Sequence, residues 1–490
     1  MAHPPVFLLK NDIMNILLLN PPWPGPGIGT RSQNRIIKRR SDLYLQFPLL
    51  MASSCACLKQ GGHDVQFIDA VRDGLDYEQT TQCAAGCSPD VILIETVTPS
   101  INCDYRYITE LKETTGAHVI MTGTHVSCFG TECLEECGAI DVIIKNDYDT
   151  RIRQTAEALG DTEKLLAVPG ICFRADGEVH DTGGCCFDPD LDSLPFPDRE
   201  TIPFEKYGEA FYNRKPFTNM LTTRGCPNNC NYCITSNIME GAEWRTRSIP
   251  DVIEEIKELT GRYGVREINF DDGTFNISRN RVMEFCHELK RNSISILWIC
   301  NARVTPVDRE MLGEMRSAGC KMIRYGVESA DEAVLEYMGK NITLDQVRQA
   351  FRLTKKAGIL ALGGFMFGFP VDTRETVEKT IAFMKELKPD MIQASIPMPY
   401  PGTRMYEQTK ESGQLVFKEW EEFDMTHGPV VALKDIEREE LKTILSRVYR
   451  EFYLRPGFIL QTLLHIRRWS DISRIWRGFR SMLGLVRFHR

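Results

Sequence analysis

The sequence predicts an α/β protein: a doubly wound, Rossmann-like N-terminal domain, a partial (β/α)6 TIM-like barrel and a C-terminal helical tail. Two series of short apolar runs, each run followed by a helical stretch, are the first observation behind this prediction. The second is a Gly-, Asp- and Pro-rich stretch between the two series, which is typical of a linker. We therefore expect an N-terminal extension, a first domain, a linker, a barrel and a C-terminal helical region, at residues 1–13, 14–155, 156–212, 213–410 and 411–490.

Length and composition are those of an ordinary globular protein, with 490 residues, 42% hydrophobic and 26% charged. The net charge is −8, yet residues 451–490 carry eight arginines against two acidic residues. A mainly acidic body argues against nucleic acid as a partner. The 17 cysteines are not spaced as a disulfide framework, which predicts a reducing, cytoplasmic location. No apolar run reaches the roughly 18 residues that span a bilayer, and the first residues lack the layout of a signal peptide.

The first series predicts a parallel sheet, because its runs are continuously apolar and helical stretches separate them. Its strands are expected at Ile16–Asn20, Asp64–Asp69, Asp90–Glu95, His118–Gly123 and Ile140–Lys145. In an open sheet of this kind, ligands lie outside the carboxyl ends of the strands. The loops after Asn20, Asp69, Glu95 and Gly123 are therefore candidate ligand contacts.

The second series predicts six strand-helix units, too few for an eight-unit barrel of ~250 residues. Its strands are expected at Thr218–Thr222, Glu267–Asp271, Ser295–Cys300, Lys321–Val327, Leu360–Phe367 and Met391–Ile396. The helical stretches are Pro250–Tyr263, Arg279–Arg291, Thr343–Ala357 and Arg374–Leu387. Reactive groups of parallel barrels gather at the carboxyl ends of the strands, so motifs at those ends are candidate site residues.

Three cysteines follow the first barrel strand at C-x3-C-x2-C spacing: Cys226, Cys230 and Cys233, in Thr-Arg-Gly-Cys-Pro-Asn-Asn-Cys-Asn-Tyr-Cys. Three thiolates on one loop can hold three irons of a four-iron cluster and leave the fourth iron open for chemistry. A structural zinc site is the first alternative, but it requires four ligands, and the next Cys or His is Cys286. Buried thiols without a metal are the second alternative.

This loop, including Tyr232, resembles the signature loop of the radical SAM superfamily. In the first series, Pro48-Leu-Leu-Met, Gly61-Gly-His-Asp-Val-Gln-Phe-Ile-Asp-Ala and Gly123-Thr-His resemble the cobalamin-binding domain fused ahead of many radical SAM proteins. The resemblance implies three cofactors: a [4Fe-4S] cluster, S-adenosylmethionine (SAM) and cobalamin. It also implies that the open iron chelates the amino and carboxylate groups of SAM.

For cobalamin, the resemblance implies contacts from Asp69, Gly123, Thr124 and His125. The Asp-x-His-x-x-Gly motif, whose histidine ligates cobalt in some cobalamin proteins, is absent, since the region reads Asp69-Ala-Val-Arg-Asp-Gly74. His125 is a candidate to approach the corrin, and an ordinary polar residue at a strand end is the alternative. A domain of this fold that binds nothing is the alternative for the whole region.

For SAM, the resemblance implies contacts from strand-end residues of the barrel: Tyr232, Asp272, Gly273, Asn301, Arg303, Glu328 and Gly364. Gly364 offers a backbone edge without Cβ atoms for the adenine. Asp272 has the alternative role of a loop-capping acid, and Glu328 that of a charge at a helix N-terminus. Tyr400, in the run Pro397–Thr403 after the last strand, is a candidate catalytic residue facing the substrate, or part of a rigid turn.

The resemblance implies an enzyme that cleaves SAM reductively to a 5′-deoxyadenosyl radical and methylates an unactivated carbon through methylcobalamin. A reductant such as flavodoxin or ferredoxin would be its electron donor. The alternatives are a ring-forming or rearranging enzyme resembling the anaerobic magnesium-protoporphyrin monomethyl ester cyclase, and a non-catalytic cobalamin or iron–sulfur sensor. A methylthiotransferase is disfavoured, because the N-terminal cysteines lack the arrangement for a second cluster.

The C-terminal tail has an apolar stripe at helical spacing, with arginines on the other face. The stripe consists of Ile472, Ile475, Trp476, Phe479, Leu483 and Val486. A basic amphipathic helix with aromatic residues predicts peripheral membrane contact through residues 458–490. Such contact would favour a lipid-like substrate over a water-soluble small molecule. Packing of the stripe onto the barrel is the equal alternative.

Overall fold

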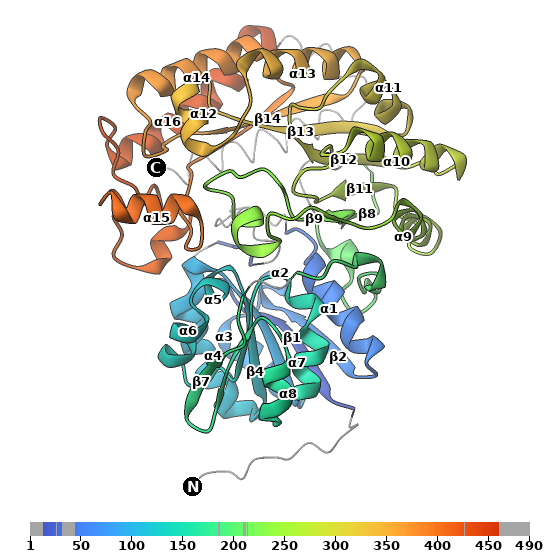
Figure 1. The fold of residues 1–490 in the computed structure, drawn as a ribbon, viewed down its shortest axis with the longest axis vertical. Helices are drawn as coiled ribbons and strands as arrows, with labels where there is room; N and C mark the ends of the chain where they lie inside the picture. Colours follow the sequence, from blue (N-terminus) through green and yellow to red (C-terminus); the bar gives the residue numbers. More distant parts are fainter. Residues whose placement is uncertain are drawn as a thin grey trace.

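The computed structural model describes residues 13–25, 27–31, 45–184, 187–208, 212, 214–425 and 427–459. Each half of the chain builds one large sheet. Figure 1 shows the N-terminal sheet below, the barrel above, and the segment with the three cysteines between them. The α/β class predicted from the sequence is confirmed.

The N-terminal sheet has the strand order β2-β1-β3-β4-β5-β6-β7, and its first five strands are parallel. These five are β1 (Asn15–Asn20), β2 (Asp64–Asp69), β3 (Val91–Thr96), β4 (His118–Gly123) and β5 (Val142–Ile144). Every residue of β3 is buried, as expected for a central strand covered on both faces. The order places the topological switch between β1 and β3, where the chain turns from one side of the sheet to the other.

Helices cover both faces of this sheet (Figure 1). The longer ones are α1 (Leu49–Gln60), α3 (Tyr77–Gly86), α4 (Ile101–Thr115), α6 (Gly130–Glu136), α7 (Ile152–Ala158) and α8 (Thr162–Ala167). Three short ones follow strand ends: α2 (Ala70–Asp73), η1 (Thr98–Ser100) and α5 (Thr124–Cys128), and η2 (Tyr148–Thr150) follows β5. The carboxyl ends of the strands thus continue into short helical turns that build the upper rim of the domain.

The segment expected as a linker, 156–212, contains two strands of the N-terminal sheet. β6 (Ile171–Ala175) pairs antiparallel with β5, and β7 (Glu178–Asp181) pairs antiparallel with β6. Ile171, Cys172 and Phe173 are fully buried, so this hairpin contributes to the core. We therefore propose that the first domain extends to Asp181. The segment also contains the end of α7 and the whole of α8, and after Asp181 its described residues hold only the short turns η3 (Leu191–Ser193) and η4 (Phe204–Lys206).

The barrel is a six-stranded parallel sheet in which chain order equals spatial order. Its strands are β8 (Phe217–Met220), β11 (Glu267–Phe270), β12 (Leu297–Ala302), β13 (Cys320–Glu328), β14 (Leu360–Met366) and β15 (Met391–Ser395). β8 and β15 are the two edges, so the barrel is open on one side. The predicted partial barrel with six units is confirmed.

The outer helices begin at residues that suit a helix start. They are α9 (Ile249–Gly261), α10 (Arg279–Arg291), α11 (Arg309–Ser317), α12 (Glu332–Met338), α13 (Leu344–Lys356) and α14 (Arg374–Leu387). Each is preceded by Ser, Thr or Asp, whose side chain accepts a hydrogen bond from a backbone N–H of the first turn. Trp298 on β12 packs against Phe270, Phe275 and Phe285, which joins α10 to the sheet.

The C-terminal region covers the edge strand β15. It comprises α15 (Arg404–Glu411), η6 (Trp420–Phe423) and α16 (Arg438–Tyr453). Tyr449 and Tyr453 of α16 place their hydroxyls on the backbone of β15: each donates to a carbonyl and accepts from the N–H of the same residue, Ala394 or Ile392, at 2.9–3.3 Å. Among the described residues, no helix is long and apolar enough to cross a membrane. The predicted amphipathic stripe of the tail lies outside the described residues.

Candidate functional site

The cysteine loop starts from a small two-stranded sheet, β9 (Thr223–Arg224) and β10 (Arg245–Thr246). Between these strands, Cys226 donates its N–H to Gly241 O at 3.1 Å and Cys233 donates to Cys230 O at 3.3 Å. Gly225 has φ +78°, and a Cβ there would lie 1.9 Å from Glu243 O, so only glycine fits. Cys226 and Cys230 are buried and Cys233 is half-buried. These two backbone bonds therefore hold the loop at its first and third cysteine.

Asn231, between the second and third cysteine, anchors the loop to the barrel. Its N–H donates to Met338 O at 2.9 Å, and its side-chain amide donates to Tyr337 O at 2.9 Å and to the Gln408 side chain at 3.0 Å. Met405 N–H donates to its carbonyl at 2.9 Å. The end of α12 and the start of α15 thus hold the loop from two directions.

The motif after β11 packs directly against this loop. The Asp272 carboxylate accepts hydrogen bonds from Thr222 N at 2.6 Å, Thr222 Oγ1 at 2.5 Å and Thr223 N at 3.1 Å, which fastens the start of β9. A Cβ on Gly273 would lie 3.7 Å from Cys226 Cβ, so the backbone of Gly273 faces the first cysteine. The Asn301 side chain, at the end of β12, donates to Asp272 O at 3.1 Å. Three strand-end motifs therefore meet at one place.

Glu328, at the end of β13, forms a buried ion pair with Lys340 (Nζ–Oε1 2.8 Å). Glu328 has φ +68°, unusual for a residue with a side chain, at a point where the register between β13 and β14 shifts. Burial alone would lower the pKa of Lys340, but the attraction of Glu328 outweighs it and leaves that pKa above its usual value. The pair therefore presents one negative and one positive group at the same rim.

Cys230 and Tyr232 lie close to this ion pair. Burial raises the pKa of the Cys230 thiol, and the positive charge of Lys340 offsets part of the rise. Burial also raises the pKa of Tyr232 well above its usual value, and the nearby Glu328 carboxylate raises it further. The Arg303 guanidinium donates to the carbonyl of Lys340, so Arg303 holds the loop between α12 and α13.

Two glycines leave a surface without side chains next to this ion pair. Gly326 and Gly364 are register partners on β13 and β14. A Cβ on Gly364 would lie 3.5 Å from Tyr325 O, which is ordinary contact, whereas one on Gly326 would lie 2.3 Å from Glu328 Oε1. The Glu328 carboxylate thus covers Gly326, whereas the backbone of Gly364 is accessible to a flat ligand.

Tyr400 is buried and contacts η6. Its hydroxyl donates to Phe423 O at 3.1 Å, and the rings of Tyr400 and Phe423 pack with centroids 6.2 Å apart. Its sequence position indicated a substrate contact, but its hydrogen bond ties the run after β15 to η6.

Of the four cobalamin candidates, Asp69 and Gly123 have structural roles. The Asp69 carboxylate accepts from Asn20 Nδ2 at 2.8 Å, Arg72 N at 3.0 Å and Tyr207 OH at 2.8 Å, so it caps α2 and joins β1 to β2. Gly123 has φ +120°, and a Cβ would lie 1.9 Å from Thr96 O, so β3 and β4 approach closely there. Both residues shape the carboxyl edge of the sheet.

His125 is covered by aromatic rings. Its ring packs on Phe129 and Trp420 with centroids 5.1 and 4.9 Å away, and its Nδ1 lies 3.3 Å from Thr98 Oγ1. Burial lowers the pKa of His125 to about 3, so the imidazole is neutral at physiological pH. Trp420 comes from η6, so the C-terminal region closes over this end of β4.

Two donor sets fit the implied cofactors. The three thiols of one loop are the donor set of a cluster, whose sulfurs bind three different irons and need not converge on one point. Among the described residues, no three His, Cys, Asp or Glu side chains converge on a single metal ion. At the carboxyl edge of the N-terminal sheet, Asn20 Oδ1, Trp23 Nε1 and Thr124 Oγ1 are buried without a hydrogen-bond partner in the described part of the chain, which suits a polar ligand.

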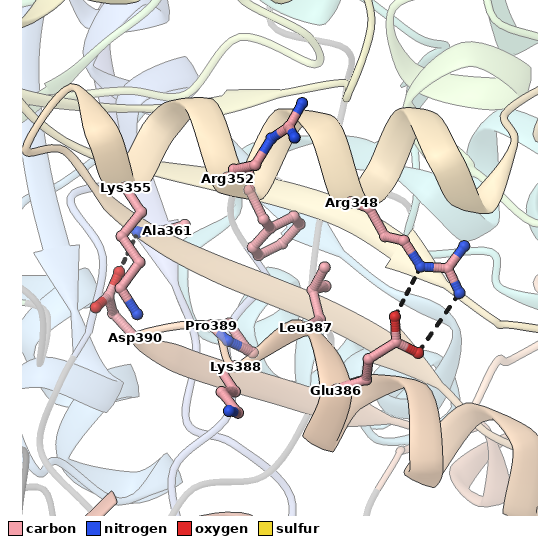
Figure 2. A pocket seen from close by; sticks show the side chains of 10 residues that line it. Arg348, Arg352, Lys355, Ala361, Glu386, Leu387, Lys388, Pro389 and Asp390 are labelled. Atoms are coloured by element: carbon pink, nitrogen blue, oxygen red, sulfur yellow. Dashed lines mark hydrogen bonds and ion pairs between the residues drawn. The ribbon is translucent and has the colours of Figure 1, made fainter.

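A surface pocket of about 210 Å³ lies elsewhere, between α13 and the end of α14 (Figure 2). Figure 2 shows Ala361 and Asp390 there, at the amino ends of β14 and β15. The amino ends face away from the cysteine rim, and Glu386 already pairs with Arg348 at 2.7 Å. This pocket is therefore separate from the site.

Sequence reasoning missed Lys340, Asn231 and Trp420. Lys340 follows a helix end in a loop, and nothing in its local pattern indicates that it reaches Glu328. Asn231 was visible within the cysteine motif, but its contacts come from α12 and α15. Trp420 covers His125 from a region predicted only as helical.

Comparison with known proteins gives a consistent result. Residues 220–384 match the family model described as the Radical SAM superfamily, and residues 44–151 match the B12 binding domain. An uncharacterized methyltransferase of Pyrococcus horikoshii is 31% identical over 85% of this chain and 90% of its own length. The anaerobic magnesium-protoporphyrin IX monomethyl ester cyclase of Cereibacter sphaeroides is 28% identical over 84% of this chain and 67% of its own length.

Two solved structures share the fold. The cobalamin-dependent S-adenosylmethionine radical enzyme OxsB superposes with a TM-score of 0.70 at 15% identity, over 97% of this chain and 72% of OxsB. The radical S-adenosylmethionine methyltransferase TsrM from Kitasatospora setae, with cobalamin and a [4Fe-4S] cluster bound, gives 0.65 at 19% identity, over 83% of this chain and 80% of TsrM.

Proposed function

Because the chain belongs to the radical SAM superfamily and carries a B12 binding domain, we propose that it methylates an unactivated carbon of a small-molecule substrate. The observation that carries the proposal is the meeting of three strand-end motifs on the cysteine loop, beside a domain in which buried polar atoms have no hydrogen-bond partner among the described residues. When bound, the [4Fe-4S] cluster with SAM supplies a 5′-deoxyadenosyl radical and cobalamin supplies the methyl group.

Cys226, Cys230 and Cys233 would hold the cluster. The loop keeps them in place through its own backbone and through Asn231, so their thiols need no rearrangement to ligate. The Lys340 ammonium, close to Cys230, would offset negative charge that collects on a thiolate-ligated cluster.

SAM would lie across the adjacent strand ends. The Glu328–Lys340 pair offers a carboxylate for its ammonium and an ammonium for its carboxylate, and the backbone of Asp272 and Gly273 borders the same space. Gly364 would leave room for the adenine. Asn301, Arg303 and Tyr232 would act by holding these groups, since the first two donate to backbone carbonyls and the third is half-buried beside Glu328.

Cobalamin would lie at the carboxyl edge of the N-terminal sheet. Thr124, whose hydroxyl has no partner within the described ranges, would bind it directly, while Asp69 and Gly123 would shape the edge. His125 would contribute a neutral ring, packed under Trp420. For Tyr400 we propose a positioning role through η6.

A second candidate function is ring formation or rearrangement, favoured by the 28% identity to the cyclase over 84% of this chain. The two functions differ in their products. Methylation yields both S-adenosylhomocysteine and 5′-deoxyadenosine. Ring formation or rearrangement yields 5′-deoxyadenosine without S-adenosylhomocysteine, because it consumes no methyl group.

We propose that a small electron-transfer protein such as flavodoxin or ferredoxin reduces the cluster in a reducing compartment. All cysteines in the described ranges are free thiols, which supports such a compartment. Membrane contact through residues 458–490 remains a prediction from sequence. Deletion of those residues should reduce partitioning onto anionic liposomes, and unchanged partitioning would contradict it.

The test is anaerobic purification of the full chain with cobalamin supplied, followed by assay of iron, sulfide, corrin and SAM products under a low-potential reductant. We expect about four irons and one corrin per chain, and 5′-deoxyadenosine formation. The Cys226→Ala, Cys230→Ala and Cys233→Ala variants should lose iron and SAM cleavage. Their control is Cys286→Ala, which removes a buried thiol on α10 and should retain both. A wild-type chain without iron would refute the proposal.

A further inference from the structure

Four buried charged side chains connect the two domains at the base of the cysteine loop. Arg224 lies on β9, which leads into the loop, and Arg245 lies on β10, which leads out of it. Asp147 and Asp149 follow β5 of the N-terminal domain. Each of the four side chains is at most 7% exposed. The contact is therefore shielded from water on all sides.

The geometry of this contact is specific. The Arg224 guanidinium donates to both carboxylate oxygens of Asp149, at 2.8 and 2.6 Å, and lies 3.5 Å from Asp147. Arg245 donates to Asp147 at 2.6 Å. A two-pronged Arg–carboxylate contact fixes direction as well as distance. Burial alone would raise the pKa of Asp149, but Arg224 outweighs it, so the carboxylate stays charged.

The small sheet below the loop needs these acids. Arg224 and Arg245 are direct register partners across β9 and β10, and like charges in such a position repel each other. The aspartates come from the other domain and lie against both arginines. Glu240 of the cysteine segment also attracts Arg224, but the carboxylates that form ion pairs with the two arginines come from the N-terminal domain.

The same N-terminal loop also contacts the far side of the cysteine segment. Asn146, with φ +60°, donates its side-chain amide to Ile238 O, in the helical turn η5 (Thr235–Met239) that follows Cys233. Its own N–H donates to Ser127 Oγ at 2.9 Å, within α5. Residues 146–149 thus contact the chain both before Cys226 and after Cys233.

We propose that Asp147 and Asp149 are positioning residues that set the place of the cysteine loop relative to the N-terminal domain. Resting on the proposed function, this means that they fix the separation between the cluster and the corrin. Buried ion pairs contribute little net stability but impose a defined geometry, which is the property that a transfer between two cofactors requires.

The proposal is tested with Asp149→Asn and with the double variant Asp149→Asn/Arg224→Gln. Glu267→Gln is the matched control, because Glu267 forms a buried ion pair with Lys321 (0% and 9% exposed) at the amino ends of β11 and β13, away from the loop. In full-length protein loaded with cob(II)alamin and reduced cluster, pulsed EPR measures the separation of the two spins. The wild type and the control should give the same single separation.

In Asp149→Asn the separation should shift or spread by more than about 1 Å, the scale of misplacement that costs a reaction about a hundredfold. The double variant leaves no charge unpaired in this ion pair, so it should regain stability while the separation stays altered. If the ion pair served stability alone, the double variant would regain both the wild-type stability and the wild-type separation. Separations equal to the wild type in both variants would overturn the proposal.

Hydrogen exchange on the protein without cofactors keeps the test independent of the proposed function. Peptides that cover residues 223–246 should exchange at least about tenfold faster in Asp149→Asn than in the wild type and Glu267→Gln, because opening of the loop becomes easier. Equal exchange in all three would refute the positioning role. A wild type without iron or corrin would refute only the proposed function.

Discussion

His125 gives a quantitative prediction about stability and pH. Burial lowers the pKa of this histidine from 6.5 to about 3. Because the folded pKa lies below the unfolded one, the unfolded chain binds the extra proton first, and stability falls as pH falls. The contribution is fully present above pH 6.5 and is lost progressively toward pH 3. Between about pH 7.5 and about pH 5 this group alone should remove about 2 kcal/mol.

His125→Phe isolates that contribution. Phenylalanine keeps an aromatic ring against Phe129 and Trp420 and loses only the contact with Thr98. The free energy of unfolding of this variant should therefore fall by about 2 kcal/mol less than that of the wild type over the same pH interval. The figure depends little on the folded pKa as long as that value lies well below pH 5.

The assay is guanidinium chloride unfolding followed by tryptophan fluorescence at both pH values. The control is His287→Gln, since the His287 side chain is 55% exposed and the variant should follow the wild type. The reasoning is refuted if wild type and His125→Phe lose the same free energy between the two pH values.

Three further predictions concern the site. Lys340→Met should lower the free energy of unfolding, measured with a chemical denaturant, by about 3 kcal/mol, because it leaves the Glu328 carboxylate buried and unpaired. Adding Glu328→Gln should recover part of this loss, and a loss near zero would contradict the ion pair. Gly364→Val should leave the melting temperature nearly unchanged but weaken SAM binding, measured by calorimetry, at least about tenfold, or 1.4 kcal/mol. Undiminished binding would show that Gly364 does not face SAM. Gly123→Ala should destabilise the fold by at least about 2 kcal/mol, because its Cβ would lie 1.9 Å from Thr96 O, and a smaller loss in thermal unfolding would show that β3 and β4 can separate there.

The parts of the fold that follow from local patterns were predictable. The strands β2 and β4 and the helices α10 and α14 have the predicted bounds, because continuous apolar runs and helical periodicity are local signals. The hairpin of β6 and β7 was not predicted, since its composition resembles a linker and its burial depends on the edge strand β5. Neighbouring strands supply the context that its own residues do not show.

The site divides in the same way. The cysteine spacing and the strand-end rule placed Asp272, Asn301 and Glu328 at one rim from sequence alone. Which group each side chain contacts was not predictable, because the partners come from distant segments: Lys340 from beyond α12, Trp420 from η6 and Asp149 from the other domain. Such contacts depend on packing angles that no local pattern encodes.

The two stacked tyrosines of α16 have a consequence for the edge strand of the open barrel. Residues four apart on a helix advance about 6 Å, close to the roughly 6.6 Å between alternate residues of a strand, so a helix can present phenols in step with strand amides. Tyr449 and Tyr453, with ring centroids 6.3 Å apart and ring planes nearly parallel, do so along Ala394 and Ile392. A phenol hydroxyl both donates and accepts a hydrogen bond, so each one takes the place of a neighbouring strand, and the backbone of Ala394 and Ile392 is not available to pair with another molecule.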